Sequence, residues 1–194
     1  MPTISSLCVY CGSSTGVSPV YAAAAERLGA ALARRGVRLV YGGGRVGLMG
    51  IMADAVLKGG GTVTGIIPGH LQNREVGHDA LSELVVVETM HERKARMSEM
   101  ADAFAVLPGG LGTLDETFEI VTWRQLRLHD KPVVIVDIDG YWGPLQAMVA
   151  SMVERGFVRK EHAALFTVVR DVDALFDALQ AMPPPRFGVD SEHI

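Results

Sequence analysis

Residues 108–116 are the stretch of this chain whose residue types and order suggest chemistry most directly. They read Pro-Gly-Gly-Leu-Gly-Thr-Leu-Asp-Glu and follow the apolar run 103–107. This order predicts a buried strand, a glycine-rich turn and then the start of a helix. The turn would expose backbone N–H groups at the positive end of the helix dipole, where phosphate groups bind. The glycines of this predicted anion site are Gly109, Gly110 and Gly112.

Two carboxylates, Asp115 and Glu116, follow directly in the first turn of that predicted helix. A loop that only holds a phosphate gains nothing from negative charge beside it, whereas a site that acts on an attached sugar could use a carboxylate. A second interpretation of Glu116 stays open, because Thr113 and Glu116 fit the capping box S/T-x-x-E. The two roles are compatible, since a carboxylate held as a cap can still present one oxygen to a ligand.

A second charged segment, residues 89–97, reads Thr-Met-His-Glu-Arg-Lys-Ala-Arg-Met. Thr89 and Glu92 form another capping-box pattern, which places Arg93 and Lys94 in the first helical turn. Cations are unfavourable at that end of the helix dipole, so a nearby anion is expected to offset them. The alternative is a solvated basic face. Arg93 could bind a phosphate through two hydrogen bonds, but it cannot be a general base because guanidinium stays protonated.

Two further glycine-rich loops follow predicted strands. Residues 42–47 satisfy G-x-G-x-x-G, but the next strand ends at 65–69 with no acidic residue to bind a ribose, so a dinucleotide fingerprint is not predicted. A phosphate or nucleotide loop and a tight structural turn both remain open. The candidate ligand-binding residues of these two loops are Gly12, Ser13, Gly43, Gly44 and Gly47.

Apolar runs alternate with helical patterns throughout the chain, and this alternation predicts the elements that position these residues. Strands are expected at 4–10, 37–41, 62–67, 84–88, 103–107, 132–137 and 165–169. Helices are expected at 19–35, 46–58, 90–100, 113–129, 141–154 and 172–181. Near-continuous apolar strands separated by helices indicate an α/β fold: a single-domain, doubly wound, Rossmann-like sheet, mostly parallel, with helices on both faces. In such sheets ligands bind at the carboxyl ends of the strands, so the three loops are expected to converge there.

We expect one catalytic domain over residues 1–182 and a mobile tail over 183–194, where three prolines precede a charged end. The 194 residues are 48% hydrophobic and 21% charged, which is typical of a globular protein. The net charge of −4 argues against a nucleic-acid partner. No apolar run is long enough to span a membrane, and the N-terminus lacks the basic region of a secretory signal, so a cytoplasmic location is expected.

The two cysteines, Cys8 and Cys11, are too few for a metal site, because no other Cys or His pair at suitable spacing completes a set of about four ligands. Cys8 lies within a predicted strand, so both are expected to be buried structural thiols. Glycine-rich phosphate loops, a basic pair and a rigid carboxylate together suggest a nucleoside monophosphate and cleavage of its N-glycosidic bond. Such a reaction passes through an oxocarbenium-like sugar cation, which a carboxylate stabilises.

The same residues resemble a known family. Residues 108–116 match the PGGxGTxxE signature of the LOG (LONELY GUY) family of cytokinin riboside 5′-monophosphate phosphoribohydrolases, and 90–94, Met-His-Glu-Arg-Lys, match a second motif at the usual separation. The similarity extends over about residues 4–180, including 11–14, 41–50, 129–132 and 139–142. Members were long labelled lysine decarboxylases, which would imply pyridoxal phosphate. Apart from the place of Lys94 in the predicted anion pocket, nothing around Lys58, Lys94, Lys131 or Lys160 suggests a Schiff-base site.

The resemblance implies a catalytic pair, Arg93 and Glu116, no cofactor, and a homodimer whose active sites lie beside the subunit interface. The implied substrate-binding positions are Glu75, Lys94, the loop from Gly109 to Asp115 with Thr113 and Leu114, and Thr122. Many members carry Glu where this chain has Asp115. The implied reaction releases a free base and ribose 5-phosphate from an N6-modified adenosine monophosphate or from AMP. A nucleotide or molybdenum-cofactor carrier on the same fold is the alternative, and it would need no Arg–Glu pair.

Overall fold

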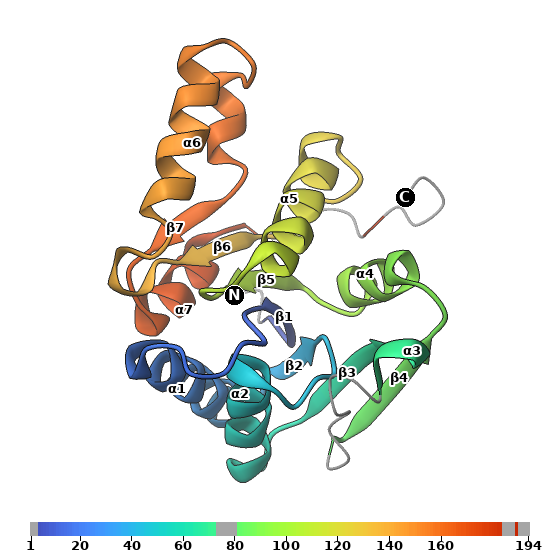
Figure 1. Cartoon of the computed structure of the whole chain (residues 1–194). Helices are drawn as coiled ribbons and strands as arrows, with labels where there is room; N and C mark the ends of the chain where they lie inside the picture. The colour runs from blue at the N-terminus through green and yellow to red at the C-terminus, as the bar shows by residue number, and fades with distance from the viewer. Residues whose placement is uncertain (1–3, 73–80, 184–188, 190–194) are drawn as a thin grey trace.

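The computed structural model describes residues 4–72, 81–183 and 189, and its chain forms one parallel sheet covered by helices (Figure 1). The strands are β1 (Ser6–Tyr10), β2 (Arg38–Tyr41), β3 (Val63–Pro68), β4 (Glu83–Val87), β5 (Ala103–Val106), β6 (Val133–Val136) and β7 (Thr167–Val169). The helices are α1 (Pro19–Arg35), α2 (Gly47–Lys58), α3 (Gly69–Gln72), α4 (Met90–Glu99), α5 (Leu111–Gln125), α6 (Gly143–Glu154) and α7 (Val172–Ala181). Two short 3-10 helices, η1 (Ile138–Gly140) and η2 (Lys160–Ala164), flank α6.

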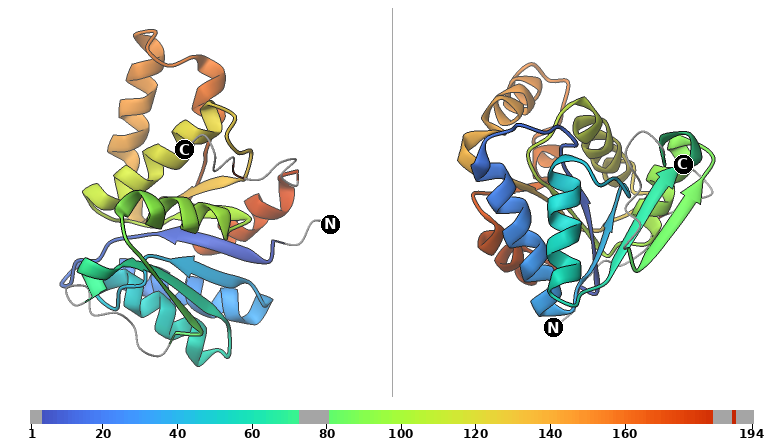
Figure 2. Two further views of the ribbon diagram at one scale, coloured as in Figure 1. Left: turned by 90° about the vertical axis from the view of Figure 1, so that its right-hand side faces the viewer. Right: turned by 60° about the horizontal axis from the view of Figure 1, so that its bottom comes forward.

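The sheet has the strand order β4-β3-β2-β1-β5-β6-β7, and every pairing in it is parallel. The predicted doubly wound α/β fold is therefore confirmed (Figure 2). The strand order reverses direction at β1, which lies between β2 and β5. At such a switch point the loops after the two central strands separate and leave a crevice at the carboxyl edge of the sheet. The loops that follow β1 and β5 carry two of the glycine-rich segments found in the sequence.

Alternating side chains of the strands build one core on each face of the sheet. In β1, Leu7 and Val9 point to a core closed by α1, α2 and α7, while Cys8 and Tyr10 point to a core closed by α4, α5 and the start of α6. Both cysteines are free and buried, as expected from the sequence. Because each face of the central strands is buried, their sequences are apolar at nearly every position.

The start of α5 and the additional short helix α3 differ from the sequence-based expectations. Helix α5 begins at Leu111, two residues before the expected start, with Gly110 at the N-cap position. Thr113 is therefore a helical residue rather than a cap, and the capping-box interpretation of Glu116 is wrong. The short helix α3 was not expected, since its four residues are too few for a periodic pattern. The proposed tail falls outside the described residues except at 183 and 189.

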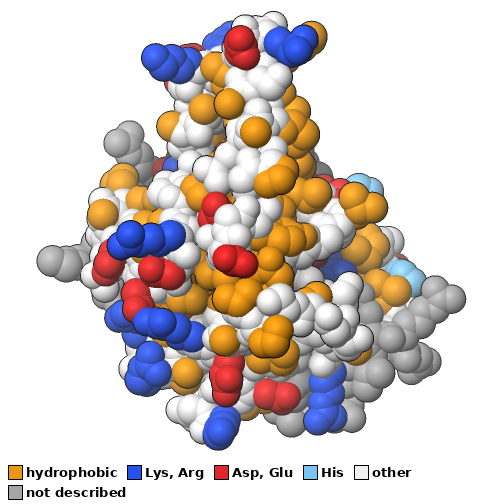
Figure 3. All heavy atoms as spheres, turned by 60° about the vertical axis from the view of Figure 1, so that its left-hand side comes forward, with side chains coloured by type: hydrophobic (Ala, Val, Ile, Leu, Met, Phe, Trp, Pro, Cys, Tyr) orange, Lys and Arg blue, Asp and Glu red, His pale blue; other side chains and the backbone are white. Residues whose placement is uncertain are grey.

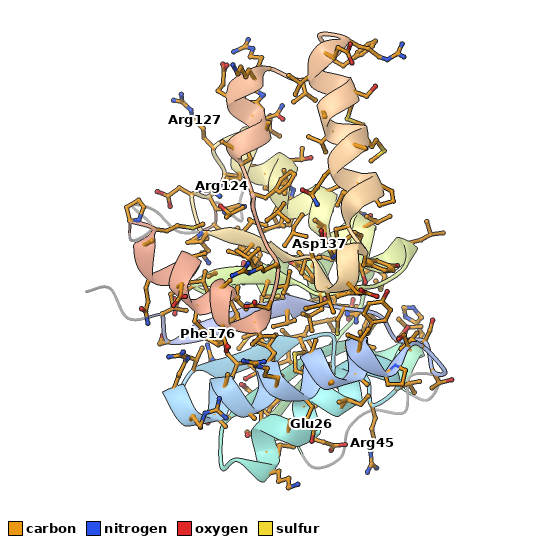
Figure 4. All side chains as sticks on the ribbon, turned by 90° about the vertical axis from the view of Figure 1, so that its left-hand side faces the viewer. Glu26, Arg45, Arg124, Arg127, Asp137 and Phe176 are labelled. Carbon is orange, nitrogen blue, oxygen red and sulfur yellow. The ribbon has the colours of Figure 1, made fainter. Side chains whose placement is uncertain are left out.

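Helix α6 projects from the body of the protein, together with the segment that returns from it (Figures 1 and 2). Its base is fixed by Asp137, whose carboxylate accepts hydrogen bonds from the Trp142 backbone N–H at 2.6 Å and from the Gln146 amide at 3.1 Å (Figure 4). Leu145 is the one residue of this helix that is buried. Among the described residues, no helix is both long and apolar enough to cross a membrane.

Candidate active site

A cleft of about 350 Å³ lies at the carboxyl edge of the sheet, at the switch point between β1 and β5. Residues far apart in the sequence line it because the loops after these two strands and the helices α2 to α5 all reach this edge. The lining residues are Cys11, Gly12, Ser13, Ser14, Met49, Leu71, Met90, Arg93, Gly110, Leu111, Gly112, Thr113, Asp115 and Glu116. The prediction that the first and third glycine loops converge on one edge of the sheet is therefore confirmed.

The N-terminus of α5 opens into this cleft. Its N-cap residue is Gly110, so no side-chain cap occupies the first N–H groups of the helix. Gly110 and Gly112 also lack the usual structural reasons for glycine: neither has a positive φ, and an added Cβ would meet no described atom within 4 Å. The space beside them is open to the cleft, and uncapped N–H groups at the positive end of a helix dipole bind anions.

The loop before α5 is held by hydrogen bonds to two of its carbonyl groups. The Gly12 backbone N–H donates to the oxygen of Pro108 at 3.0 Å, and the Tyr141 hydroxyl donates to the oxygen of Gly109 at 2.6 Å. A Cβ at Gly109 would lie 2.8 Å from the nitrogen of Gly12, so the two loops approach as closely as they do only because this residue is glycine. The anion site is thus assembled before any ligand arrives.

Arg93 enters the cleft from α4, and the cap of that helix sets its position. The Thr89 side chain accepts the Glu92 backbone N–H at 3.1 Å, and the Glu92 carboxylate accepts the N–H of Glu88 at 3.0 Å, so the predicted cap at Thr89 is confirmed. The Arg93 guanidinium is buried, with 5% of the residue exposed.

Two backbone carbonyls fix the direction of that guanidinium. Arg93 Nε donates to the oxygen of Ile66 at 3.2 Å, and Nη2 donates to the oxygen of Gly42 at 3.0 Å. These oxygens lie in β3 and directly after β2, so the sheet itself orients the cation. A Cβ at Gly42 would overlap Arg93 Nη2, which gives this glycine a steric role that the sequence did not reveal.

Glu116 lies in the second turn of α5, half-buried, and lines the cleft with Arg93. Its charge acts on the end of β1: burial, followed by the Glu116 carboxylate, raises the pKa of the Cys11 thiol, and the same two causes head those that raise the pKa of Cys8. The pKa of Tyr10 is raised by burial and, after Cys8, by Glu116. These three groups are therefore neutral at physiological pH, and the carboxylate faces the strand end where the cleft begins.

Other predicted positions lie elsewhere. Gly47 lines a neighbouring hollow of about 500 Å³ beside Ser14 and Arg45, which is larger than the cleft but lacks the Arg93–Glu116 pair. Arg45 points outward from that side of the molecule (Figure 4). Gly43 packs against Ile67, and neither it nor Gly44 lines the cleft.

Three positions taken from the family resemblance also lie away from the cleft lining. Leu114 packs against the core under α5, and Thr122 is exposed in the second half of that helix. Lys94 is buried between α4 and α5. Glu75 lies outside the described residues. Within residues 4–72 and 81–183, no group of three or more His, Cys, Asp or Glu side chains is arranged to hold a metal ion.

Comparisons with known proteins agree with the motifs. The family model described as "Possible lysine decarboxylase" matches residues 49–179. A cytokinin riboside 5′-monophosphate phosphoribohydrolase of Arabidopsis thaliana is 42% identical over 183 residues, which are 94% of this chain and 80% of the relative. A second one from the same plant is 48% identical over 152 residues, covering 78% of this chain and 70% of the relative.

Solved structures share the fold at much lower identity. The molybdenum cofactor carrier protein of Chlamydomonas reinhardtii superposes with a TM-score of 0.70 at 21% identity, covering 90% of this chain and 95% of that one. A molybdenum cofactor binding protein from Rippkaea orientalis gives a TM-score of 0.70 at 20% identity, covering 91% of this chain and 95% of that one. At this level of identity the similarity establishes the architecture alone.

Proposed function

This chain belongs to the LOG family of cytokinin riboside 5′-monophosphate phosphoribohydrolases, and from that premise we propose that it hydrolyses the N-glycosidic bond of adenosine 5′-monophosphates. The substrate is an N6-modified adenosine monophosphate, AMP, or both, and the products are the free base and ribose 5-phosphate. The single observation that carries this proposal is the cleft in which an uncapped helix N-terminus, the fixed Arg93 guanidinium and the Glu116 carboxylate lie together.

The proposed reaction assigns a task to each of these groups. The first N–H groups of α5 bind the phosphate, with Arg93 adding positive charge beside them. The bond between the sugar carbon and the base then breaks, and its electron pair leaves with the base, which takes up a proton. Glu116 stabilises the resulting oxocarbenium-like sugar and accepts a proton from the water that attacks it. A carrier protein would need the anion site but not this carboxylate.

We predict that the protein binds AMP far more tightly than adenosine. Hydrogen bonds to a charged group and a helix N-terminus together contribute about 2–4 kcal/mol, which corresponds to roughly 30- to 1000-fold in Kd. Calorimetric titration of both ligands into a Glu116→Gln variant, which binds without consuming them, gives this ratio. Chromatography of AMP and an N6-isopentenyl AMP with the wild-type protein then tests for release of free base.

Gly112→Ala is the matched variant for the titration. Its new methyl group meets no described protein atom within 4 Å, so we expect the fold to be retained and a bound ligand to meet the methyl group. We expect it to weaken AMP binding and to leave adenosine binding almost unchanged. Equal affinities for AMP and adenosine in the Glu116→Gln protein with Gly112 unchanged would show that the glycine loop is only a structural turn. Tight AMP binding without release of base would favour the carrier alternative.

We also propose that the protein is a homodimer, with an interface that includes the projecting α6. This helix carries no charged residue before Glu154, yet only Leu145 is buried, and Met148 remains 41% exposed. Hydrophobic side chains gather along the projection and below it (Figure 3). Phe118 of α5 and Leu126, the residue after that helix, are exposed as well. Contiguous apolar surface of this kind is typical of an interface with another protein chain.

Light scattering tests this assembly directly. We expect a particle of twice the 20.8 kDa chain mass at micromolar concentration. Met148→Glu should shift the population toward single chains, because a charge buried without a partner is strongly unfavourable at an interface. Glu154→Gln, at the end of the same helix, is the control and should leave the assembly intact. A wild-type particle of 20.8 kDa would contradict the proposal.

The cytoplasm is the location that we propose. The chain has two cysteines, and both are free thiols buried in the core. Thiols persist in this form in the reducing conditions of the cytosol. Microscopy of a tagged protein in its own cell tests this assignment, which fails if the signal lies outside the cytoplasm.

A further inference from the structure

Lys94 is adjacent to Arg93 in the sequence but occupies a different environment. Consecutive residues point about 100° apart around a helix axis, so the two side chains leave α4 in different directions. Arg93 lines the cleft, whereas Lys94 is directed at α5 and is 8% exposed. Its Nζ atom donates hydrogen bonds to Asp115 Oδ2 at 3.2 Å and to Glu119 Oε1 at 2.9 Å.

The two partners of Lys94 bracket Glu116 on α5. Three carboxylates at positions 115, 116 and 119 lie within about one helical turn, and like charges three or four residues apart repel each other. Burial lowers the pKa of Lys94, but the hydrogen bonds and charges of Glu119 and Asp115 outweigh it and leave that pKa raised. The amine therefore stays charged between its two partners.

We propose that Lys94 is a positioning residue for the reaction, not a contact of the substrate: it neutralises Asp115 and Glu119, and thereby keeps Glu116 ionised and fixed toward the cleft. This inference rests on the proposed function, in which Glu116 acts on the sugar. It replaces the role of substrate binding that the family resemblance implied for Lys94. The ion pairs of Lys94 are only partly buried, because 61% of the Asp115 side chain and 21% of the Glu119 side chain are exposed, and such pairs contribute little to stability by themselves.

Among the described residues, the groups named for the surroundings of Glu116 come from β1, the residue after it, α4 and α5. Cys8 and Tyr10 of β1 and Cys11, which follows that strand, interact electrostatically with Glu116, and burial raises the pKa of each, so they are neutral. Two positive charges lie on α4, at Arg93 and Lys94. Two further negative charges, at Asp115 and Glu119, lie on α5, the helix that carries Glu116. Loss of the Lys94 charge leaves two unbalanced carboxylates beside Glu116, and nearby like charges raise the pKa of a carboxyl group.

Lys94→Met tests this, because methionine is an unbranched side chain of similar length without charge. At neutral pH we expect kcat to fall roughly 10- to 100-fold with KM for the nucleotide within about threefold, since the binding groups are untouched. The acid limb of the kcat profile should move up by about one pH unit. In the double variant Lys94→Met/Glu119→Gln, most of both changes should be reversed.

Different outcomes identify different roles. A KM raised more than about tenfold with an unmoved acid limb would make Lys94 a substrate contact and overturn the proposal. A lower melting temperature with an unchanged pH profile, and no rescue by Glu119→Gln, would make it purely structural. If Lys94→Met does not fold, Glu119→Gln alone still tests the proposal. Removal of one negative charge beside Glu116 should move the acid limb of the kcat profile to lower pH, and an unmoved acid limb would contradict the proposal.

A titration that needs no turnover separates this inference from the proposed function. Carbon NMR of labelled glutamate carboxyls, with Glu116→Gln used to assign the signal, follows the ionisation of Glu116 in the wild type and in Lys94→Met. A wild type that releases no base would refute the proposed function, while a raised Glu116 pKa in Lys94→Met would still support the role of Lys94. An unchanged Glu116 titration would refute that role whether or not the protein is active.

Discussion

Glu116→Gln is expected to lower kcat by roughly 10²–10⁴-fold while the protein stays folded and binds AMP. Glutamine keeps the shape of the side chain, but a neutral amide neither stabilises an oxocarbenium ion nor accepts a proton from water. Since α5 begins at Leu111 with Gly110 at its N-cap, Glu116 does not cap the helix, and its replacement should cost at most about 1 kcal/mol of stability. Single-turnover release of base and a thermal melt measure the two effects.

Glu99→Gln is the control for this variant. It makes the same chemical change on α4, where Glu99 accepts a hydrogen bond from Arg96 at 3.2 Å outside the cleft, and should leave turnover unaffected. Near-normal turnover by a folded Glu116→Gln protein would contradict the proposed mechanism. Asp115, which also lines the cleft, would then be the first residue to test as the active carboxylate.

Gly42→Ala is expected to lower kcat/KM about 100-fold, although residue 42 contributes no side chain to the chemistry. The new Cβ would overlap Arg93 Nη2 and force the guanidinium away from the oxygens of Gly42 and Ile66. A displacement of about 1 Å in a positioned catalytic group is enough for a loss of this size. The variant should also lose about 1–2 kcal/mol of stability with these hydrogen bonds, measured by urea unfolding.

Gly60→Ala is the control that separates the loss of activity from the loss of stability. Gly60 follows α2 with a φ of 75°, and its added Cβ meets no described atom within 4 Å, so the change strains the backbone and nothing else. An alanine in this conformation costs about 1–2 kcal/mol, similar to the loss expected for Gly42→Ala. Turnover should nevertheless stay at the wild-type level in Gly60→Ala. If both variants lose activity in proportion to stability, the steric role of Gly42 is refuted.

Much of the fold could be predicted from the sequence because its signals are local. Five of the seven expected ranges contain the strand found there, since buried parallel strands are apolar at nearly every position, and β3 and β4 each extend one residue beyond the expected range. The start of α5 was misplaced because Thr113 offers a better capping side chain than Gly110. A cap made by glycine carries no side-chain signal, and here the open N-terminus is part of the proposed site.

The candidate site was predictable only in part. The segments 89–97 and 108–116 contain their own helix starts, so Arg93, Glu116 and the glycines of the second segment could be proposed from residue types and spacing. The support of Arg93 by the carbonyls of Gly42 and Ile66 could not, because these oxygens lie 51 and 27 residues away along the chain. The sequence also could not show that Gly43 and Gly44 lie outside the cleft lining, because their loop pattern is typical of both a ligand-binding loop and a tight structural turn.

The sequence by itself determined which segments are strands and where the two candidate motifs lie, because periodicity, capping and charge act over a few residues. The tertiary structure decided where the side chains point. Lys94 and Arg93 are indistinguishable as neighbouring cations in the sequence, yet the packing of α4 against α5 pairs Lys94 with Asp115 and Glu119. The sheet edge turns Arg93 into the cleft instead. Which of these two cations enters the cleft depends on how α4 packs against α5 and the sheet. Contacts between elements distant in the chain set this packing.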